Sequence, residues 1–417
     1  MIFTGAAQKD IYHCLKCGLC LASCPIYKEL RVEGVAPRSK VQLAKALLEN
    51  RLEPSRQLQD LLSLCLTCRA CEANCPSGLQ LEPLIITMRA GLAARYRLNW
   101  KKRFFYKKII AEKWFLPFSS QGLRFLQYLP IKPRIGSVYP QYIPWWERPS
   151  LSRALPEHIP GQNKEVRGRV LYFPGCLTDY IVPTIGRSLI RVLTRMGYEV
   201  ILPKGLRCCS YPVFMAGYEE WALANLKNNL KVLSSYDAIG VVTSCPTCGL
   251  ALKKIYLSIL KERQEDLSLA QSISARTWDI SEFIYKNIDL SGLLRGRKLS
   301  RIEPEIIYHD PCHLAFGQGI KQEPREILGQ GLVGALKEFE GPITCCGAGG
   351  AFHLFFPDVS AKIAKNRVED IKKAQVKTVV TGCPACIIQL GSNLAQEQEG
   401  YQVFHTIQWL DRAILSV

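Results

Sequence analysis

The stretch that decides the fold reads Cys14-Leu-Lys-Cys17-Gly-Leu-Cys20-Leu-Ala-Ser-Cys24-Pro25, and a second stretch of the same form reads Cys65-Leu-Thr-Cys68-Arg-Ala-Cys71-Glu-Ala-Asn-Cys75-Pro76. Four cysteines with two, two and three residues between them, followed by proline, are the ligand run of a cubane [4Fe-4S] cluster. Structural zinc is the alternative, but zinc sites usually take cysteine pairs that stand well apart in the sequence. The two runs therefore predict two cubane clusters.

The fourth cysteine of each run is expected to serve the other cluster. In such paired runs the fourth cysteine crosses over. The predicted ligand sets are therefore Cys14, Cys17, Cys20 and Cys75 for one cluster, and Cys65, Cys68, Cys71 and Cys24 for the other. Each cluster would tie both runs together.

Length and cysteine content indicate the class of protein. The chain has 417 residues, 48% of them apolar, which is enough for two or three domains with full cores. Eighteen cysteines would suggest disulfides in a small secreted chain, but this chain is large, shows no signal peptide at Met1, and groups its cysteines by metal-ligand spacing. We therefore expect reduced, mostly metal-bound cysteines and a cytoplasmic location.

The charge of the chain indicates an anionic partner. Its 54 basic and 36 acidic residues give a formal net charge of +18, which suits an acidic protein, a phospholipid surface or nucleic acid. No run approaches 18 consecutive apolar residues, so we expect no membrane-spanning helix and only peripheral contact with the cytoplasmic face of a membrane.

The 40 residues between Cys24 and Cys65 have a helical pattern. One helix is predicted over residues 38–50 with Ser39 as its N-cap, and a second after Pro54 and Ser55 that ends just before Cys65. Their apolar faces consist of Val41, Ala44, Leu47, Leu48, Leu58, Leu61 and Leu62. The pattern resembles the all-helical ferredoxin domains, in which two cluster runs lie at helix ends, and predicts such a domain over residues 5–98.

A basic and aromatic segment covers residues 95–118, with eight basic residues and one acidic residue. All but its first four residues belong to a segment at 99–165 that the pattern sets apart from the domains on either side. A basic helix with an aromatic face can rest on an anionic bilayer and so reach a membrane quinone, or it can pack its aromatic side chains onto a neighbouring domain. Both interpretations stay open, whereas no nucleic-acid module accompanies the charge, and we expect no nucleic-acid partner.

Prolines dominate the segment that follows, residues 119–165. They stand at Pro130, Pro133, Pro140, Pro144, Pro149, Pro156 and Pro160, together with Trp145 and Trp146. Such a density of prolines excludes long helices and predicts an extended connector tied down by its aromatic side chains.

The remainder of the chain is an internal repeat. In each copy an apolar strand leads to a single cysteine, an adjacent pair follows after 31 or 32 residues, and a Cys-Pro-x-Cys motif follows after 35 or 36 more. The first series is Cys176, Cys208, Cys209, Cys245 and Cys248, and the second is Cys312, Cys345, Cys346, Cys383 and Cys386.

Strands that alternate with helical stretches, such as 185–197 and 359–374, predict an α/β unit with a parallel sheet in each copy. Ligands of such sheets collect at the carboxyl ends of the strands, so the five cysteines of a copy are expected to converge there. We predict two such domains, over residues 166–290 and 300–417, with approximate twofold symmetry. The complete fold is then α plus α/β: a helical ferredoxin domain, a proline-rich connector and two cysteine-rich domains.

The cysteine series resembles a known family. A cysteine, then Cys-Cys-Gly, then Cys-Pro-x-Cys is the motif of the cysteine-rich subunit of heterodisulfide reductase and its relatives. Two cubane runs followed by two such motifs resemble the glycolate oxidase iron-sulfur subunit, and the lactate-utilisation iron-sulfur protein and the iron-sulfur subunit of anaerobic glycerol-3-phosphate dehydrogenase are also similar. The resemblance extends over nearly the whole chain.

The resemblance implies a non-cubane [4Fe-4S] cluster held by the five cysteines of a copy. The second copy keeps the full motif, whereas the first has Ser210 where glycine is usual. Glycine there would let the backbone take a positive φ, and serine is less suited to it. Zinc, which needs four ligands, or an empty site is therefore the alternative for the first copy.

Three histidines stand near the second motif. His309 and His313 flank Cys312, and His353 follows the glycine-rich residues 347–350. A histidine beside a reducible cluster could donate a proton to a substrate or quinone, although a histidine hydrogen-bonded within a loop is commoner. His309 and His313 are the candidates for a catalytic role, and the glycines are interpreted as room for backbone near the cluster.

No flavin or nicotinamide motif and no catalytic triad stands out, so we expect neither FAD nor NAD in this chain. The resemblance implies an electron-transferring subunit of a flavin-dependent 2-hydroxy-acid (glycolate or lactate) dehydrogenase, whose FAD partner oxidises the substrate. One alternative is an enzyme that reduces a disulfide at a non-cubane cluster, because the chain also resembles two subunits of heterodisulfide reductase joined together, one with the cubane runs and one with the motif pair. A zinc-holding scaffold protein is the other.

Overall fold

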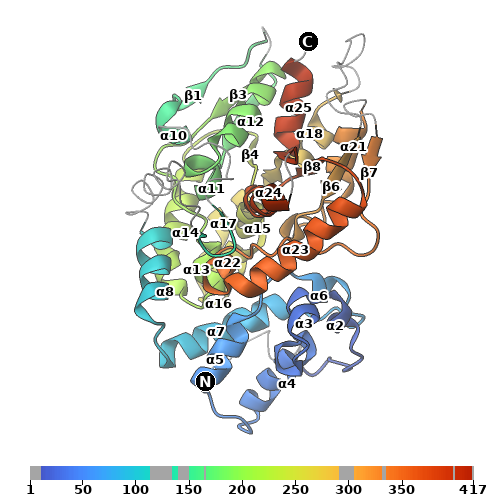
Figure 1. Ribbon diagram of the computed structural model, residues 1–417. Coiled ribbons are helices and arrows are strands. Elements are labelled where there is room, and N and C mark those ends of the chain that lie inside the picture. Colours follow the sequence, from blue (N-terminus) through green and yellow to red (C-terminus); the bar gives the residue numbers. More distant parts are fainter. Residues whose placement is uncertain are drawn as a thin grey trace.

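The computed structural model describes residues 11–112, 134–139, 150–163, 166–290, 305–330, 335–397 and 400–415. Figure 1 shows a helical N-terminal part, drawn in blue, below two sheets with helices around them. Every strand pairing is parallel except that of β1 with β3. The predicted mixture of helices and parallel sheets is therefore confirmed.

Within residues 11–112 the structure contains helices and no strand. α5 begins after Ser55, as predicted, and the hydroxyl oxygen of Ser55 accepts a hydrogen bond from the backbone N–H of Leu58 at 3.1 Å. The predicted Ser39 cap of the preceding helix is wrong: α4 begins at Pro37, because proline presets the φ of a first turn, and the Ser39 hydroxyl donates to Glu33 instead. The elements are α2 (Leu19–Ser23), α3 (Pro25–Leu30), η1 (Glu33–Val35), α4 (Pro37–Leu48), α5 (Arg56–Ser63), α6 (Ala70–Ala73), α7 (Leu81–Arg95), α8 (Trp100–Phe104) and η2 (Phe105–Ala111, a π-helix).

A small apolar core supports the cysteine runs. Val41 and Leu47 of α4 pack with Leu62 of α5 and with Ile85 and Met88 of α7. The half-buried cysteines in contact with this core are Cys14, Cys65, Cys71 and Cys75. The helices thus fix the positions of cysteines from both runs.

The first sheet has the strand order β1-β3-β2-β4-β5. β1 lies within the segment predicted as connector and pairs antiparallel with β3, with His158 opposite Ile201. β4 is buried along its whole length and β2 over its last three residues, as is usual for parallel sheets covered on both faces. The elements are α10 (Leu151–Ala154), β1 (His158–Ile159), β2 (Gly168–Tyr172), α11 (Gly175–Tyr180), α12 (Pro183–Arg195), β3 (Tyr198–Ile201), α13 (Tyr211–Met215), α14 (Glu219–Ser234), β4 (Gly240–Thr243), α15 (Pro246–Leu250), η4 (Ala251–Ile255, a π-helix), α16 (Tyr256–Glu262), α17 (Ser268–Ala275), β5 (Thr277–Asp279) and α18 (Ile280–Asn287).

The second sheet is entirely parallel and has the order β7-β6-β8-β9, which repeats the order β3-β2-β4-β5 of the first. β6 is central and pairs with β8 so that Ile307 lies opposite Val379. The elements are β6 (Glu305–His309), α20 (Cys312–Ala315), α21 (Gln322–Gly329), β7 (Ala335–Lys337), α22 (Phe352–Phe355), α23 (Pro357–Lys373), β8 (Thr378–Thr381), α24 (Pro384–Glu397), β9 (Gln402–His405) and α25 (Thr406–Leu415). The internal repeat of the sequence is therefore a repeat of topology.

The two repeats pack against each other reciprocally. α12 of the first contacts α25 of the second, and α18 of the first contacts α21 of the second. One apolar core crosses the boundary, with Tyr172 and Leu189 from the first repeat and Trp409 from the second. At its edge Arg191 Nε donates to Asp411 Oδ2 at 3.0 Å. These reciprocal helix contacts are consistent with the predicted approximate twofold symmetry.

The basic segment is helical over residues 100–111, and this helical part docks on the protein. Phe105 and Tyr106 of η2 contact the ring of Phe355, with centroids 5.5 and 5.6 Å apart. Trp100 and Phe104 of α8 are exposed. Some aromatic side chains of the segment thus pack onto a neighbouring part of the chain, whereas others remain available for contact with a membrane. Residues 113–118 lie outside the described residues. Within the described ranges, no helix combines the length and the apolar character that crossing a bilayer demands.

Two pieces of the predicted connector are described. Residues 134–139 lie against the second repeat, where Arg134 Nη2 donates to the carbonyl of Pro357 at 3.0 Å and the backbone N–H of Tyr139 donates to Ser392 Oγ at 2.7 Å. Residues 150–163 lead into the first sheet. Pro130, Pro133, Pro140, Pro144, Pro149 and the Trp145-Trp146 pair lie outside the described residues.

The buried Arg89 joins the N-terminal part to the first repeat. From α7 its guanidinium donates to the carbonyls of Leu62 and Cys65, at 2.6 and 2.8 Å, and to the carbonyl of Met215 at 2.6 Å. The backbone of Arg89 also lies so close to Gly217 that a Cβ there would approach it to 2.5 Å. Close backbone contact and a buried guanidinium together fix how the two parts meet.

Replacing Arg89 with methionine is expected to lower the thermal unfolding temperature by several degrees. The change leaves the carbonyls of Cys65 and Met215 without a donor and removes one donor from the Leu62 carbonyl, which keeps the N–H of Cys65, at a cost of about 2 kcal/mol or more. Arg95→Met, at the exposed end of the same helix, is the control and should unfold like the unmodified chain. Scanning calorimetry of both variants makes the comparison, and equal unfolding temperatures would show that the Arg89 hydrogen bonds contribute nothing to stability.

Candidate metal centres

Two adjoining cavities lie in the N-terminal part, and cysteines of both runs line each of them. The first is lined by Cys14, Cys17, Cys20 and Cys75, which are the four residues predicted to share a cluster, and by Cys71. Cys17 is exposed and the other four are half-buried. Because no cysteine that lines the second cavity is as exposed as Cys17, we call this one the outer cavity and the second one the inner cavity.

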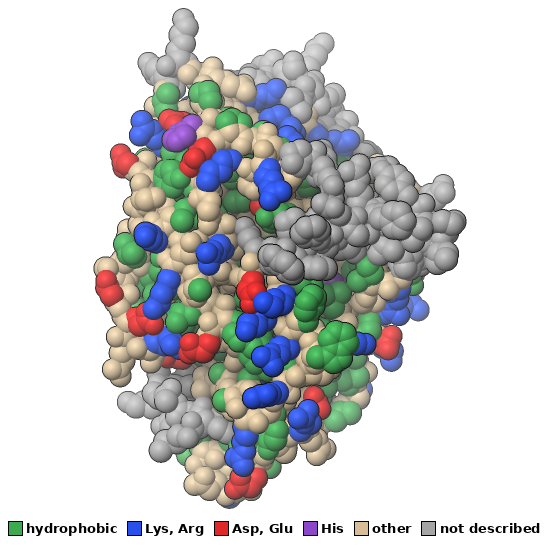
Figure 2. All heavy atoms as spheres, turned by 90° about the vertical axis from the view of Figure 1, so that its left-hand side faces the viewer, with side chains coloured by type: hydrophobic (Ala, Val, Ile, Leu, Met, Phe, Trp, Pro, Cys, Tyr) green, Lys and Arg blue, Asp and Glu red, His purple; other side chains and the backbone are tan. Residues whose placement is uncertain are grey.

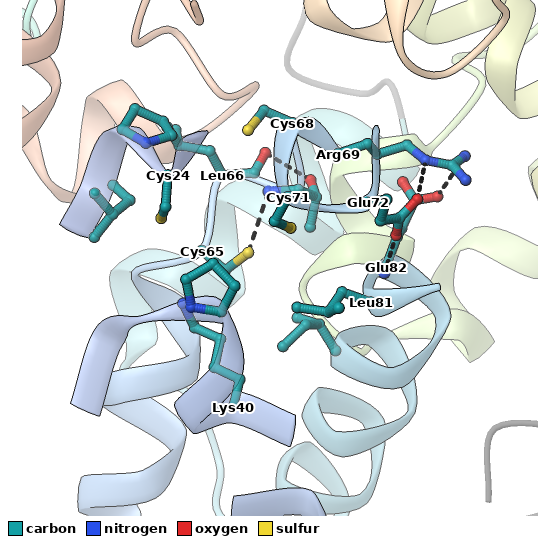
Figure 3. A pocket seen from close by; sticks show the side chains of 15 residues that line it. Cys24, Lys40, Cys65, Leu66, Cys68, Arg69, Cys71, Glu72, Leu81 and Glu82 are labelled. Atoms are coloured by element: carbon teal, nitrogen blue, oxygen red, sulfur yellow. Dashed lines mark hydrogen bonds and ion pairs between the residues drawn. The ribbon is translucent and has the colours of Figure 1, made fainter. Parts of the chain in front are cut away.

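The second cavity is lined by Cys24, Cys65, Cys68 and Cys71, again a predicted set. Figure 3 shows Cys24, the last cysteine of the first run, and Lys40 of α4 facing the three cysteines of the second run. Cys24 and Cys68 are buried. Since Cys71 and Leu81 line both cavities, the two cavities are neighbours.

The two runs have the same backbone shape. Lys16 and Gly18 have positive φ values of 56° and 85°, and Thr67 and Arg69, at the same positions of the second run, have 52° and 64°. Left-handed residues curl a chain so that its N–H groups point inward, which is how backbone forms anion sites. One of these groups, the N–H of Thr67, donates to Cys65 Sγ at 3.5 Å.

A buried cation accompanies the second cavity. Lys40 is 1% exposed and lines the cavity, where its Nζ donates to the carbonyl of Val35 at 2.5 Å. Burial raises the pKa of the Cys24 thiol, and the nearby Lys40 ammonium opposes that effect. The positive charge therefore favours the thiolate form that binds metal.

The five cysteines of the first repeat come together at the carboxyl ends of its strands. Cys176 Sγ lies 3.7 Å from Cys208 Sγ, and Cys209 Sγ lies 3.5 Å from Cys248 Sγ. The thiol of Cys245 completes the group beside Cys248. Gly175 is required here, because a Cβ at this position would lie 2.6 Å from Cys248 Sγ.

Ser210 takes the conformation that glycine would take. Its φ is 58°, in the left-handed region that Gly347 occupies at 89° in the second repeat. Asn225 Nδ2 donates to Ser210 Oγ at 2.9 Å and so supports this conformation. The expectation that serine is unsuited to a positive φ is wrong for this site, because a hydrogen bond offsets the modest cost of the left-handed backbone.

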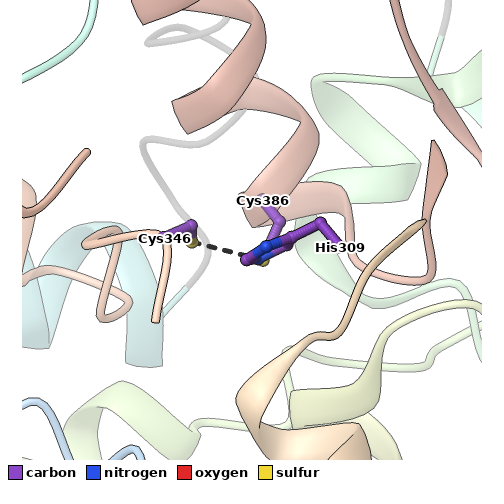
Figure 4. Close-up of side chains that lie close together, drawn as sticks. All are labelled: His309, Cys346 and Cys386. Atoms are coloured by element: carbon purple, nitrogen blue, oxygen red, sulfur yellow. Dashed lines mark hydrogen bonds between the residues drawn. The ribbon is translucent and has the colours of Figure 1, made fainter. Parts of the chain in front are cut away.

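The five cysteines of the second repeat also converge. Cys346 Sγ and Cys386 Sγ are 3.2 Å apart, and the thiol of Cys312 donates a hydrogen bond to Cys345 Sγ. Cys383 lies close to Cys312 and Cys386. The neighbouring thiols of Cys345 and Cys386 lower the pKa of Cys346. Figure 4 shows that the ring of His309 points at Cys346 and Cys386.

The second repeat adjoins the second N-terminal cavity. Cys68 and Cys345 belong to one buried cluster, and Cys312 packs against it. Burial raises the pKa of the Cys68 thiol well above its usual range, and charge on Cys345 and Cys312 raises it further. The two N-terminal cysteine groups and that of the second repeat therefore form a continuous series.

His313 lies where all three parts of the chain meet. Its Nδ1 is 2.9 Å from Thr247 Oγ1 of the first repeat, and its Nε2 is 3.1 Å from the carbonyl of Thr67. Burial lowers the pKa of His313 to about 4. Both ring nitrogens of His313 thus have hydrogen-bond partners, as in the commoner, structural role of such a histidine. His353 Nδ1 likewise lies 2.8 Å from the carbonyl of Gly350.

Beside His313 lies a buried polar group that the sequence did not point to. The hydroxyl of Tyr211 donates to Glu82, and Arg69 binds Glu82 at 3.1 Å and Glu72 at 2.7 Å. Burial raises the pKa of Glu82 to about 7, although Arg69 opposes the shift. The sequence gives no spacing signal for this polar group or for Lys40, because the tertiary fold brings these side chains to their partners.

These donor sets suit thiolate-bound metals. All eighteen cysteines fall into the four groups, as free thiols. Cysteine thiolates are the ligands of [4Fe-4S] clusters, and each N-terminal cavity is lined by at least the four cysteines that one cluster needs.

The profile of a 4Fe-4S dicluster domain matches residues 10–79, and that of a cysteine-rich domain matches residues 170–253 and 306–391, together more than half of the chain. The chain belongs to the iron-sulfur proteins that join a dicluster domain to two cysteine-rich domains. The suspected relationship to the glycolate oxidase iron-sulfur subunit family is confirmed at this level.

Relatives of this iron-sulfur protein are similar along nearly its whole length. A fumarate reductase (CoM/CoB) subunit from Methanothermobacter marburgensis is 29% identical, over 97% of this chain and 73% of the relative. A probable glycolate oxidase iron-sulfur subunit from Bacillus subtilis is 26% identical, over 94% and 90%. The glycolate oxidase iron-sulfur subunit of Escherichia coli is 26% identical, over 93% and 91%. This iron-sulfur protein is thus related to subunits of oxidoreductase complexes.

Proposed function

We propose that this protein is the electron-transferring subunit of a flavin-dependent 2-hydroxy-acid dehydrogenase, with glycolate or lactate as the substrate of an FAD-containing partner. It would work in the cytoplasm or at the cytoplasmic face of a membrane, with quinone or another carrier as acceptor. The observation that carries the proposal is the continuous series of cysteine groups, linked by Cys71 in both N-terminal cavities and by Cys68 beside Cys345.

In this proposal the two N-terminal cavities hold cubane [4Fe-4S] clusters. Cys14, Cys17, Cys20 and Cys75 bind one, and Cys65, Cys68, Cys71 and Cys24 bind the other. Such clusters accept and release single electrons, which is the chemistry that an electron-transferring subunit needs. Lys40 offsets the negative charge of the thiolates, and the apolar side chains of Ile26, Leu81 and Ile85 limit access of water to the inner site.

For the repeats, we propose a non-cubane [4Fe-4S] cluster on the five cysteines of the second. The first repeat presents the same five thiols on a backbone of the same local conformation at Ser210. Five converging thiols exceed the four that zinc takes, so we favour a second non-cubane cluster there over zinc.

The surface offers a docking region for an anionic partner. Figure 2 shows the side of the molecule that carries α8, where Lys and Arg side chains outnumber Asp and Glu and surround exposed apolar side chains. Positive charge speeds the encounter with an acidic protein surface. We propose that the flavoprotein or the membrane meets the protein on this side.

Affinity purification under anoxic conditions, followed by iron, zinc and flavin assays, tests the proposal. We expect brown protein with at least about eight iron atoms per chain, as two cubane clusters require, and a co-purifying yellow flavoprotein that oxidises glycolate or lactate. Colourless protein with little iron, or zinc in its place, would exclude an electron-transferring role.

A second candidate function is reduction of a disulfide at the cysteine-rich sites. It is favoured by the similarity to the fumarate reductase (CoM/CoB) subunit over 97% of the chain. The isolated protein, supplied with a reduced dye, would then release thiols from a disulfide. Absence of thiol release alongside electron transfer from the flavoprotein would exclude this alternative.

The exposed part of α8 is expected to bind anionic vesicles. The double variant Lys101→Gln/Arg103→Gln removes two exposed charges beside Trp100. Each basic residue near such a surface contributes about 1 kcal/mol, so binding should weaken by about tenfold or more. Sedimentation with phosphatidylserine vesicles measures the change, and Lys231→Gln/Lys261→Gln, at exposed positions of α14 and α16, is the control. Equal binding by both double variants would assign α8 to protein docking alone.

A further inference from the structure

The second cysteine-rich repeat carries a buried histidine that the first repeat lacks. His309 ends β6, three residues before Cys312, and Phe173 stands three residues before Cys176. Both side chains are 1% exposed. The equivalent positions therefore differ in one respect: an imidazole can bind a metal and a phenyl ring cannot.

The ring of His309 lies among thiols. A nitrogen of the ring, Cys346 Sγ and Cys386 Sγ all lie within 4.8 Å of one another, and the two sulfurs are 3.2 Å apart. Two ligands of one tetrahedral metal, with bonds of about 2.0 Å to nitrogen and 2.3 Å to sulfur, stand roughly 3.5 Å apart. The three side chains, drawn together in Figure 4, are thus close to the spacing of ligands of a common metal.

Both ring nitrogens of His309 are buried without a hydrogen-bond partner among the described residues. Burying such a group without a partner costs about 1 to 3 kcal/mol, so it calls for an explanation. Other buried histidines have partners: His405 Nε2 lies 3.0 Å from the carbonyl of Ser244, its Nδ1 accepts from the N–H of Ile407, and His313 is bonded at both nitrogens.

We propose that His309 supplies a nitrogen ligand to the metal group of the second cysteine-rich repeat, in addition to its cysteines. This inference rests on the proposed function, because it requires that the repeat holds iron. An imidazole adds a donor without adding negative charge to a buried group of five thiols. Arg367, which is 4% exposed and lies near Cys345 and Cys346, already offsets part of that charge. The two repeats would then hold chemically different centres.

Isotope labelling with pulsed electron paramagnetic resonance tests the assignment on the intact chain. The chain is grown with ¹⁵N-histidine, purified without oxygen, and measured both oxidised and after dithionite. We expect strong hyperfine coupling to a histidine nitrogen, of the size that a direct iron–nitrogen bond gives. The predicted ligands of the N-terminal clusters are all sulfur, so such a coupling must come from a cysteine-rich repeat.

Two variants assign the coupling to a residue. His309→Phe, which places the residue of the first repeat at this position, should lose the nitrogen coupling. His353→Gln should retain the coupling, because His353 is a histidine of the same repeat whose Nδ1 already lies within hydrogen-bond distance of the Gly350 carbonyl. No strong coupling in the unmodified, iron-loaded chain, or coupling that survives in His309→Phe, would overturn the inference and leave the proposed function intact. A chain without iron in the second repeat would instead refute the proposed function. The measurement on the unmodified chain does not depend on the variants folding.

Discussion

Replacing Cys345 with alanine is expected to stop electron transfer through the complex while the flavoprotein partner still binds. Cys345 is 5% exposed and lies in the buried cluster that links Cys68 to the second repeat. Loss of groups that merely support metal ligands costs about 10- to 100-fold in activity, so loss of a ligand should cost more. Dye reduction with glycolate or lactate measures the transfer, and co-purification measures binding.

The control for this variant is Ser188→Ala, an equally small truncation of a buried side chain in α12. Its turnover should match that of the unmodified protein. Cys345 is too deeply buried to contribute to docking, so lost partner binding in Cys345→Ala would mean that the variant misfolds. Unchanged turnover with full partner binding would remove the second repeat from the electron path.

Alanine variants of the N-terminal cysteines are expected to fall into two groups that do not follow the order of the sequence. Cys24→Ala should lose the same cluster as Cys68→Ala, because both residues line the inner cavity. Cys75→Ala should lose the same cluster as Cys14→Ala, because both line the outer one. Each change should lower the iron content by about four atoms per chain, the content of one cubane cluster.

Paramagnetic resonance after dithionite reduction distinguishes the groups. Two clusters so close together give an interaction spectrum, and a single remaining cluster gives a simple one that should be the same within each pair of variants. Turnover should also differ, since the inner cavity is the one beside Cys345. If Cys24→Ala instead matched Cys14→Ala, each run would hold its own cluster and the crossed assignment would be wrong.

The sequence predicted several of the elements but not the contacts between them. Spacing alone predicted the groups of cysteines, and the helical period predicted α5, α12 and α23 with small errors at their ends. These features depend on neighbours in the chain. The start of α4 was missed because Pro37 presets the first turn, which made the Ser39 hydroxyl unnecessary as a cap.

The contacts between different parts of the chain could not be predicted from the sequence. Nothing in the pattern around Cys68 indicated that Cys345 lies beside it, and nothing distinguished Thr67 or Thr247 as partners of His313. The basic segment shows the same limit. Its aromatic period suits a membrane and a protein surface equally, and only the position of Phe355 decides that Phe105 turns inward.

The reciprocal packing of α12 and α25 has a consequence for biosynthesis. A ribosome makes a chain from its N-terminus, and domains usually fold in that order. Here the apolar surface of residues 183–195 is covered only when residues 406–415 have been synthesised and pack against it. The earlier half of the polypeptide therefore reaches its final form only after residues 406–415 have left the ribosome, and a premature stop codon near residue 400 would disable both halves at once.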